Sequence, residues 1–133
     1  MYAQPSYCDP TTFIFALLWF DGNNTGEWRI HGLWPETCQG CPNCGYPSYC
    51  RKVHFNSSKI ENLMPKIKHR WFPSKDLIEH EWLKHGSCTG NVTEFEYFNK
   101  TLNLWDCIPY IQECPNSGAE CRLLLQAYQV QKC

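Results

Sequence analysis

Ten cysteines in a chain of 133 residues constrain the fold more than any other feature of this sequence. Cysteine at this density is typical of small secreted domains, in which disulfide bonds supplement a limited hydrophobic core. The even number allows every cysteine to pair. Spacing alone does not determine which cysteines are joined. The cysteine count therefore predicts a disulfide-stapled domain and leaves its connectivity open.

Four N-x-[ST] glycosylation sequons point to the same oxidising compartment, because such an acceptor matters only in a chain that enters the secretory route. The sequons lie at Asn23, Asn56, Asn91 and Asn99. Asn23 and Asn91 lie in apparent turns and are the better candidates. We expect a protein that is secreted or held in acidic vesicles of the secretory and lysosomal route. The length and the 43% hydrophobic content fit one core, so residues 1–133 are expected to form one domain, monomeric by default.

Membrane insertion and long-range attraction to nucleic acid are both disfavoured. No stretch reaches the ~20 apolar residues that a membrane-spanning helix needs, so we expect no membrane span. Residues 1–10 contain no Lys or Arg, unlike a signal peptide, and we interpret Met1 as the start of a mature or trimmed chain. The net charge is −1 and would become +4 if all five histidines were protonated. Binding of a polyanion must therefore rely on locally clustered positive side chains, and it would be stronger at acidic pH, where the histidines are protonated.

Strands are predicted at both ends of the chain. The apolar run 13–20 is followed by turn residues and then by a second strand over 27–33, which Pro35 is expected to end. The Cys-, Pro- and Gly-rich segment 36–50 is expected to be a stapled loop. A closing strand is expected over 122–130.

Three helices are predicted between these strands. A capping box at 58–61 precedes an apolar stripe, and Pro65 is expected to bend this first helix. A second helix is expected over 74–85, ending at Gly86. A third, opened by another capping box, spans 93–105. Helices in the middle of the chain and strands at its ends favour an α+β fold.

The segment 80–85 carries the densest set of reactive side chains. At about 100° per residue, its four polar residues fall within one arc of a helix. His80 and Lys84 form one i, i+4 pair, and Glu81 and His85 form a second beside it. The two apolar residues between them are directed away and can anchor the helix in the core. The segment thus places two imidazoles, an ammonium and a carboxylate on one rigid face.

The segment 80–85 also resembles a metal-binding motif and a solvated charged surface. The zinc-protease motif needs histidines four residues apart, whereas His80 and His85 are five apart, so we expect no metal. A run of mixed charge on a helix is often only a solvated surface. Here Gly86, Ser87 and Cys88 follow directly and hold the end of the helix within the stapled core.

A second informative segment covers residues 28–35. A lone histidine on a strand, such as His31, is more often structural than catalytic. Its neighbours change this, because Gly32 permits close approach of a ligand or of another backbone, and Trp34 offers a flat face. Trp34 is a candidate for stacking on a base or ribose, and a core tryptophan is the alternative.

Together, the two segments resemble the two conserved active-site segments of the T2 family of secreted ribonucleases. They read Ile30-His31-Gly32-Leu33-Trp34-Pro35 and His80-Glu81-Trp82-Leu83-Lys84-His85-Gly86-Ser87-Cys88. The similarity extends more weakly over 28–105. It implies an antiparallel sheet flanked by helices, with catalytic groups converging from a strand and a helix. It also implies a disulfide bond between Cys50 and Cys88.

The resemblance further implies the role of each site residue. His31 and His85 would be the acid–base pair, with His31 as general acid to the leaving 5′-oxygen and His85 as general base to the 2′-hydroxyl. His80 would help to hold the phosphate, while Glu81 and Lys84 would stabilise the transition state. The substrate would be single-stranded RNA, cleaved without cofactor through a 2′,3′-cyclic phosphate to 3′-phosphate ends. DNA lacks the 2′-hydroxyl and would not react.

The sequence departs from the family pattern in three places. Leu77 and Ile78 stand where the family usually has an aromatic pair, which affects the packing beneath His80. The chain is short after Trp105, which affects the walls of the base-binding sites. The third departure is a group of closely spaced cysteines, for which disulfides are favoured over metal binding. These are Cys38, Cys41, Cys44 and Cys50.

Two alternatives to a ribonuclease remain at this point. One is a secreted glycoprotein effector that acts mainly by binding a receptor, with ribonuclease activity reduced or secondary. The other is a small thiol–metal module built around 38–50, which the sequons disfavour. RNA digestion in excess EDTA, together with a free-thiol count, separates all three.

Overall fold

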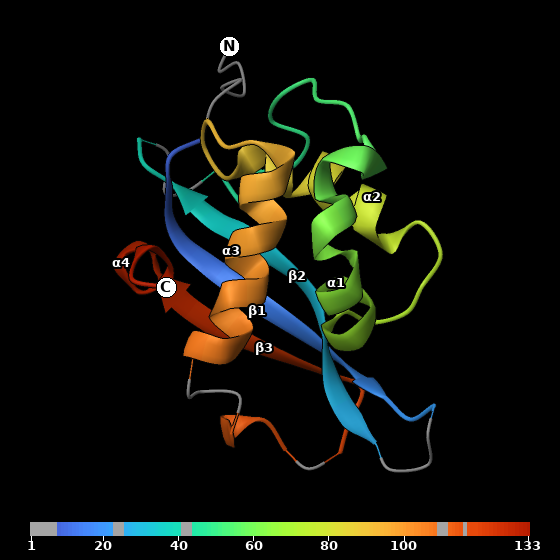
Figure 1. Ribbon diagram of the computed structural model, residues 1–133. Helices are drawn as coiled ribbons and strands as arrows, with labels where there is room; N and C mark the ends of the chain where they lie inside the picture. Colours follow the sequence, from blue (N-terminus) through green and yellow to red (C-terminus); the bar gives the residue numbers. More distant parts are fainter. Residues whose placement is uncertain (1–7, 23–25, 41–43, 109–111, 116) are drawn as a thin grey trace.

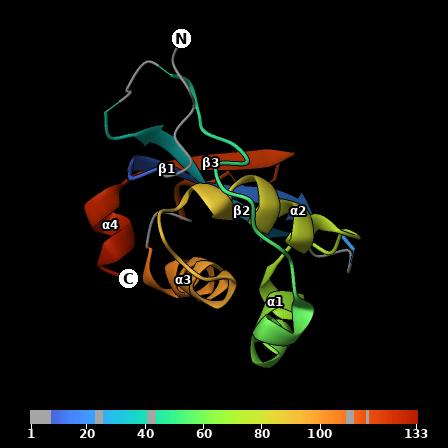
Figure 2. The same cartoon turned by 90° about the horizontal axis from the view of Figure 1, so that it is seen from above.

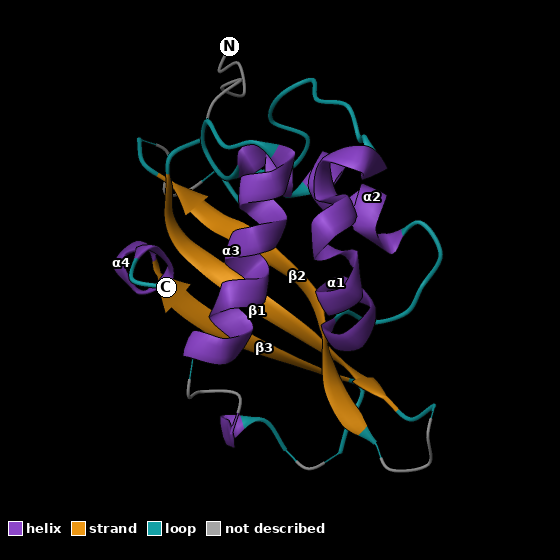
Figure 3. Ribbon diagram, in the orientation of Figure 1, coloured by secondary structure: helices purple, strands orange, loops and turns teal. Residues whose placement is uncertain are grey.

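The computed structural model describes residues 8–22, 26–40, 44–108, 112–115 and 117–133. Three antiparallel strands form one sheet in the order β2-β1-β3 (Figure 1). They are β1 (Pro10–Phe20), β2 (Glu27–Cys38) and β3 (Glu120–Gln126). Helices pack against this sheet, as the colouring by secondary structure shows (Figure 3). The predicted α+β class, an antiparallel sheet flanked by helices, is confirmed.

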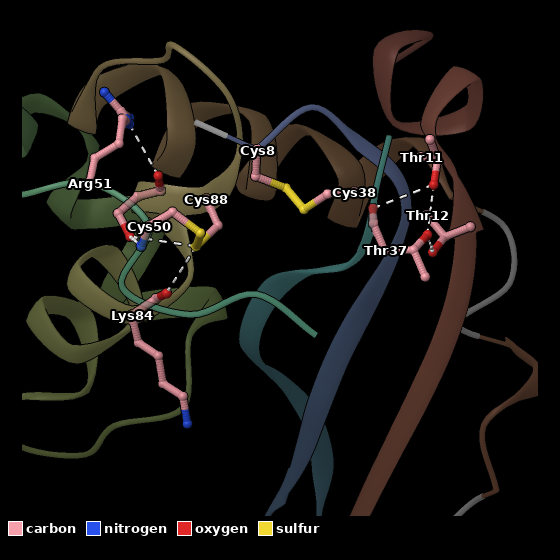
Figure 4. The surroundings of a disulfide bond; sticks show 10 residues. Cys8, Thr11, Thr12, Thr37, Cys38, Cys50, Arg51, Lys84 and Cys88 are labelled. Carbon is pink, nitrogen blue, oxygen red and sulfur yellow. Dashed lines mark hydrogen bonds between the residues drawn. A yellow bond between two sulfur atoms is a disulfide. The ribbon is translucent and has the colours of Figure 1, made fainter. Parts of the chain in front are cut away.

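The second strand is longer than predicted. It continues through Pro35 to Cys38, and Thr37 shares side-chain hydrogen bonds with Thr11 and Thr12 at 2.6 and 2.7 Å (Figure 4). The prediction that Pro35 ends the strand is wrong. Proline is tolerated here because β2 is an edge strand and its register against β1 shifts next to Pro35, leaving Glu36 as an extra residue.

The closing strand is shorter than predicted. It ends at Gln126, and the helix α4 (Ala127–Gln131) follows directly. The backbone N–H of Gln126 donates to the side chain of Gln129 at 2.8 Å, within a reciprocal capping box. Glutamine is not among the common N-cap residues, so the sequence carries no clear signal for the start of this helix.

The helical segments lie close to the predicted positions, but the predicted first helix is two separate segments and the second helix begins at Leu77 instead of Ser74. The first is a 3₁₀ helix, η1 (Ser57–Leu63), capped by Asn56, whose side chain accepts from the backbone N–H of Ser58. The predicted capping box at 58–61 is therefore wrong. Pro65 lies in the first turn of a separate helix, α1 (Met64–Arg70), where its missing N–H is no loss.

Three further helical segments complete the fold. The helix α2 (Leu77–Lys84) is followed by the 3₁₀ helix η2 (Gly86–Cys88). The helix α3 (Glu94–Cys107) begins as predicted, with the hydroxyl of Thr93 accepting from the N–H of Glu96 at 3.1 Å. No helix of the described residues is long and apolar enough to cross a membrane.

The core lies between one face of the sheet and the helices α1 and α3, which occupy the same side of it (Figure 2). The predicted apolar stripe faces this core through Ile60, Leu63 and Ile67. From the sheet, Phe13, Phe15, Leu17, Ile30, Leu33, Leu123 and Leu125 meet it. Alternate residues of the strands consequently face away from the core, and the site described below is built from these.

Disulfide bonds connect segments that are distant in sequence. Those described join Cys8–Cys38, Cys50–Cys88, Cys107–Cys133 and Cys114–Cys121. Cys44 is also disulfide-bonded, while Cys41 lies outside the described residues. No free thiol exists in the part of the chain that the structure describes, so no thiolate there can bind a metal.

Candidate active site

His31 is the extra residue of a β-bulge. Ala16 pairs with Gly32 and Leu17 pairs with Ile30, so His31 lies between them without a partner on β1. The bulge resolves the imperfect alternation of the sequence, because Ile30 and Leu33 can now both face the core. Bulges often re-aim a side chain next to an active site, and here the bulge directs His31 into a pocket on the other face.

The helix α2 lies at the β2 edge of the sheet and directs side chains both into the core and into the pocket that contains His31. Trp82 enters the core at 3% exposure and donates its indole N–H to the carbonyl oxygen of His54 at 2.9 Å. On the other side, His80, Glu81, Lys84 and His85 line the same pocket as His31. The arc predicted from the sequence is therefore formed, with Trp82 as its anchor.

Glu81 is fully buried and is held by Trp34, whose indole N–H donates to Glu81 Oε1 at 2.6 Å. Any side chain at position 32 would overlap with that oxygen, so the contact requires Gly32. Glu81 Oε2 is buried without a hydrogen-bond partner in the described structure. Burial raises the pKa of Glu81 to about 7, against the opposing effects of Trp34 and Lys84. Glu81 is therefore largely protonated below neutral pH.

The two predicted acid–base histidines contact the same tryptophan. The His85 ring stacks on Trp34 with centroids 5.0 Å apart, and the His31 ring meets Trp34 edge-on at 4.9 Å. The Nδ1 atoms of both histidines are buried and unpaired within the described residues. Proton exchange with a substrate would therefore use Nε2.

Burial also sets the charge state of the two histidines. Desolvation lowers the pKa of His85 to about 3, and the charges of Lys84, His80 and His31 add to this effect. Desolvation likewise lowers the pKa of His31, which Glu120 opposes. His85 is thus neutral, as a general base must be, throughout the pH range above about 3.

The pocket has a volume of about 320 Å³ and unites every predicted catalytic residue. It also contains Pro35, from the first of the two motif segments, and four residues that the sequence did not single out, namely Ile14, Glu36, Tyr46 and Arg122. The sheet register and the 36–50 loop bring these four residues to the site. Lys84 Nζ lies 5.7 Å from the centre of the Tyr46 ring.

Another, larger cavity, of about 470 Å³, lies among β1, α3 and α4. None of the predicted catalytic residues lines it. Its floor includes Phe13, Leu33 and Val130, and it contains no histidine. The candidate acid–base pair therefore lies in the smaller pocket and not in this one.

His80, Glu81 and His85 form a cluster of possible metal ligands although the two histidines are five residues apart. Ligand atoms of His80, Glu81 and His85 all lie within 4.8 Å of one another. His85 is the C-cap of α2, with φ −106°, so its ring departs from ideal helical geometry and approaches the other two. The three side chains could share one ion. The prediction that the protein uses no metal is not tested by this geometry.

The sequence matches the Ribonuclease T2 family over residues 3–121. The chain belongs to the Ribonuclease T2 family. The resemblance predicted from the two segments is thereby confirmed. As a T2-family protein, the chain is 35% identical over 107 residues to Ribonuclease DdI from Dictyostelium discoideum, covering 75% of this chain and 44% of the relative.

Other T2-family proteins show the same partial coverage. Ribonuclease T2 from Homo sapiens is 35% identical over 89 residues, covering 59% of this chain and 32% of the relative. Ribonuclease MC1 from bitter gourd seeds superposes with a TM-score of 0.61 at 22% identity, covering 72% of this chain and 57% of that one. The chain thus spans less than half the length of the relatives from Dictyostelium discoideum and Homo sapiens. The bitter gourd structure supports the assignment of the fold alone.

In this T2-family chain the Cys50–Cys88 bond stabilises the end of α2 that carries His85 (Figure 4). It is the pairing that the family resemblance implies. The backbone N–H of Cys50 donates to Ser87 Oγ at 3.1 Å, and Arg51 Nε donates to the Ser87 carbonyl at 3.1 Å. The N–H of Tyr49 donates to the Lys84 carbonyl at 2.9 Å. The loop before α1 therefore clamps the last turn of α2.

Leu77 and Ile78, the aliphatic pair that departs from the family pattern, still anchor the start of α2. Both residues are half-buried and pack against the main core. His80 follows them on the exposed side of α2, with Nε2 4.0 Å from Glu81 Oε2. This departure from the family pattern leaves α2 anchored.

Proposed function

We propose that this T2-family chain is an endoribonuclease that cleaves single-stranded RNA by transphosphorylation without a metal. The observation that carries the proposal is the convergence of His31, from the bulge in β2, and His85, from the end of α2, on one pocket. The 2′-hydroxyl must lose a proton while the 5′-oxygen gains one, and two imidazoles can perform both transfers.

In the first step, neutral His85 accepts the proton of the 2′-hydroxyl, and the 2′-oxygen attacks phosphorus. The bond from phosphorus to the 5′-oxygen breaks, and protonated His31 donates its proton to that oxygen. In the second step, His31 removes a proton from water, which opens the 2′,3′-cyclic phosphate, and His85 returns its proton to the 2′-oxygen. The product is a 3′-phosphate.

The remaining polar residues of the pocket stabilise negative charge. Lys84 supplies a cation next to His85, and exposed His80 is placed to hold a phosphate oxygen. Glu81 lies one helical turn before His85, and only its ionised fraction, which falls as the pH drops below about 7, can support the positive charge that His85 acquires. Trp34 fixes Glu81 and His85 through the contacts above. Whether Trp34 also stacks on a base remains a prediction.

Activity is expected to peak in acid. His85 must be neutral, so the rate rises as pH increases through about 3, whereas His31 must be protonated, so the rate falls as pH rises through a value below 6.5. The measurement is kcat/KM for a dinucleoside monophosphate between pH 2.5 and 8, in EDTA. A rate that still increases above pH 7 would contradict this assignment.

The same assay separates the proposal from the receptor-binding alternative. Wild-type protein that releases 2′,3′-cyclic phosphate ends in EDTA supports the ribonuclease. Protein that is folded but releases none at any pH between 3 and 7 supports a glycoprotein that acts by binding.

We also propose that the protein is secreted or held in acidic vesicles, which suits the ten cysteines and the acidic optimum. At least two sequons should carry glycans in a eukaryotic secretory host. Asn56 and Asn91 are exposed, whereas Asn99 is half-buried in α3 and its Thr101 is fully buried, donating to the Tyr97 carbonyl. Asn23 lies outside the described residues. Peptide mapping should find Asn56 and Asn91 modified more fully than Asn99, and an unchanged mass after deglycosylation would contradict secretion.

A further inference from the structure

Arg122 lies in the pocket although it belongs to β3, the strand farthest from α2. Its neighbours Leu123 and Leu125 face the core, so alternation directs Arg122 to the opposite face. On that face Arg122 pairs with Ala16, which in turn pairs with Gly32 on β2. The family match ends at residue 121, one position before Arg122.

Two small residues allow Arg122 to reach across the sheet. Ala16 and Gly32 offer little side-chain bulk on this face, and the Arg122 guanidinium lies 5.2 Å from the centre of the Trp34 ring. The side chain of Arg122 thus crosses β1 toward β2. The guanidinium joins the pocket from the edge opposite α2, which carries Lys84 and His80.

The guanidinium of Arg122 is largely free to bind a ligand. Its Nε atom contacts Glu120 Oε1 at 3.3 Å, and about half of each side chain is exposed. Its Nη atoms make no hydrogen bond within the described part of the chain. Those Nη atoms present the paired N–H groups that suit a phosphate.

Arg122 lies on the His31 side of the pocket, because its partner Ala16 pairs in turn with Gly32, the residue that follows His31 on β2. Burial is the main cause of the lowered pKa of His31, and Arg122 is among the charges that lower it further. The charges that lower the pKa of His85 belong to Lys84, His80 and His31 instead. In the proposed mechanism, His31 protonates the leaving nucleotide, so Arg122 lies on the side from which that nucleotide departs.

We propose that Arg122 binds the next phosphate group along the RNA, on the 3′ side of the leaving nucleotide. This inference rests on the proposed function and on His31 as the general acid. It makes Arg122 a substrate-binding residue for chains longer than a dinucleotide. The two cations of α2 would serve the scissile phosphate, and Arg122 would serve its 3′ neighbour.

Three substrates of the same base sequence test the proposal: NpN, NpNp with an added 3′-phosphate, and pNpN with an added 5′-phosphate. The wild type should cleave NpNp about tenfold more efficiently than NpN, which is the effect expected of one charge-assisted hydrogen-bonded contact. In Arg122→Gln this ratio of kcat/KM values should fall to about one, while the ratio of pNpN to NpN stays as in the wild type. The salt dependence of log(kcat/KM) for NpNp should also weaken in Arg122→Gln, because one ion pair with phosphate is lost.

Arg122→Lys should retain part of the NpNp preference, because it keeps the charge and loses the paired donors. Lys66→Gln, an exposed charge on α1, is the control for general loss of charge and should keep the full preference. The assignment is overturned if the wild type shows no NpNp preference, if pNpN is the preferred substrate, or if Arg122→Gln keeps the NpNp preference. A wild type that cleaves none of the three substrates overturns the proposed function, and this inference with it.

Discussion

His85→Ala is expected to slow RNA cleavage by about 10²–10⁴-fold, the contribution of a positioned general base. His85 is the buried, neutral imidazole of the pocket. The same variant should slow hydrolysis of a 2′,3′-cyclic phosphate, because the second step runs the same proton transfers in reverse. Initial rates on RNA and on the cyclic phosphate measure both effects. His69→Ala, an exposed histidine on α1, should leave both rates unchanged.

His31→Ala is expected to slow RNA cleavage by a similar factor, and to regain activity on a nitrophenyl phosphodiester. The recovery follows because nitrophenolate leaves without a proton, which makes the general acid dispensable. If His85→Ala is the variant that recovers on this substrate, the two roles are exchanged. Near-normal RNA cleavage by both variants would show that this pocket is not the catalytic site.

Removal of the Cys50–Cys88 bond by a double serine substitution should lower the free energy of unfolding by about 4 kcal/mol. The bond joins residues 38 positions apart, and the loss of stability grows with the length of the closed loop. Replacing Cys114 and Cys121, only 7 positions apart, is the matched control and should lower it by about 2 kcal/mol. Urea unfolding under non-reducing conditions measures both.

The first of these variants should also lose activity at temperatures where it is still folded, because the bond clamps the turn that carries His85. The control variant should retain activity there. Equal losses of stability and activity in the two variants would contradict this role of the Cys50–Cys88 bond.

The sequence correctly predicted which side chains of α2 share one face, but it did not predict the bulge or the length of β2. Helical periodicity alone placed Glu81 and His85 on one face with Trp82 on the other, because a single helix turn determines all three. The bulge at His31 depends on which residue of β1 lies opposite, and the sequence of one strand does not contain that information. The strand's extension through Pro35 was missed for the same reason, since only the sheet order shows that β2 is an edge.

Contacts between distant segments were the hardest to foresee. The pairing of Cys50 with Cys88 came from family resemblance, because spacing allowed many connectivities. The hydrogen bond from Trp34 to Glu81 joins residues 47 positions apart and explains Gly32, which the sequence had marked only as a place of close approach. No sequence motif marks Arg122 as a site residue. It lies in the pocket only because β3 pairs with β1 and β1 pairs with β2.

The bulge at His31 also determines what a deletion of this one residue would do to the sheet during evolution. If His31 alone were deleted, Gly32 would still face Ala16, Ile30 would still face Leu17, and the ladder between them would be uninterrupted. The deletion would also remove the His31 carbonyl, which accepts from the indole N–H of buried Trp71 at 3.0 Å, so one contact between β2 and the core would be lost. A single-codon deletion would nevertheless leave a more regular ladder between β1 and β2 without the proposed general acid, so the proposed activity lies one mutational step from loss.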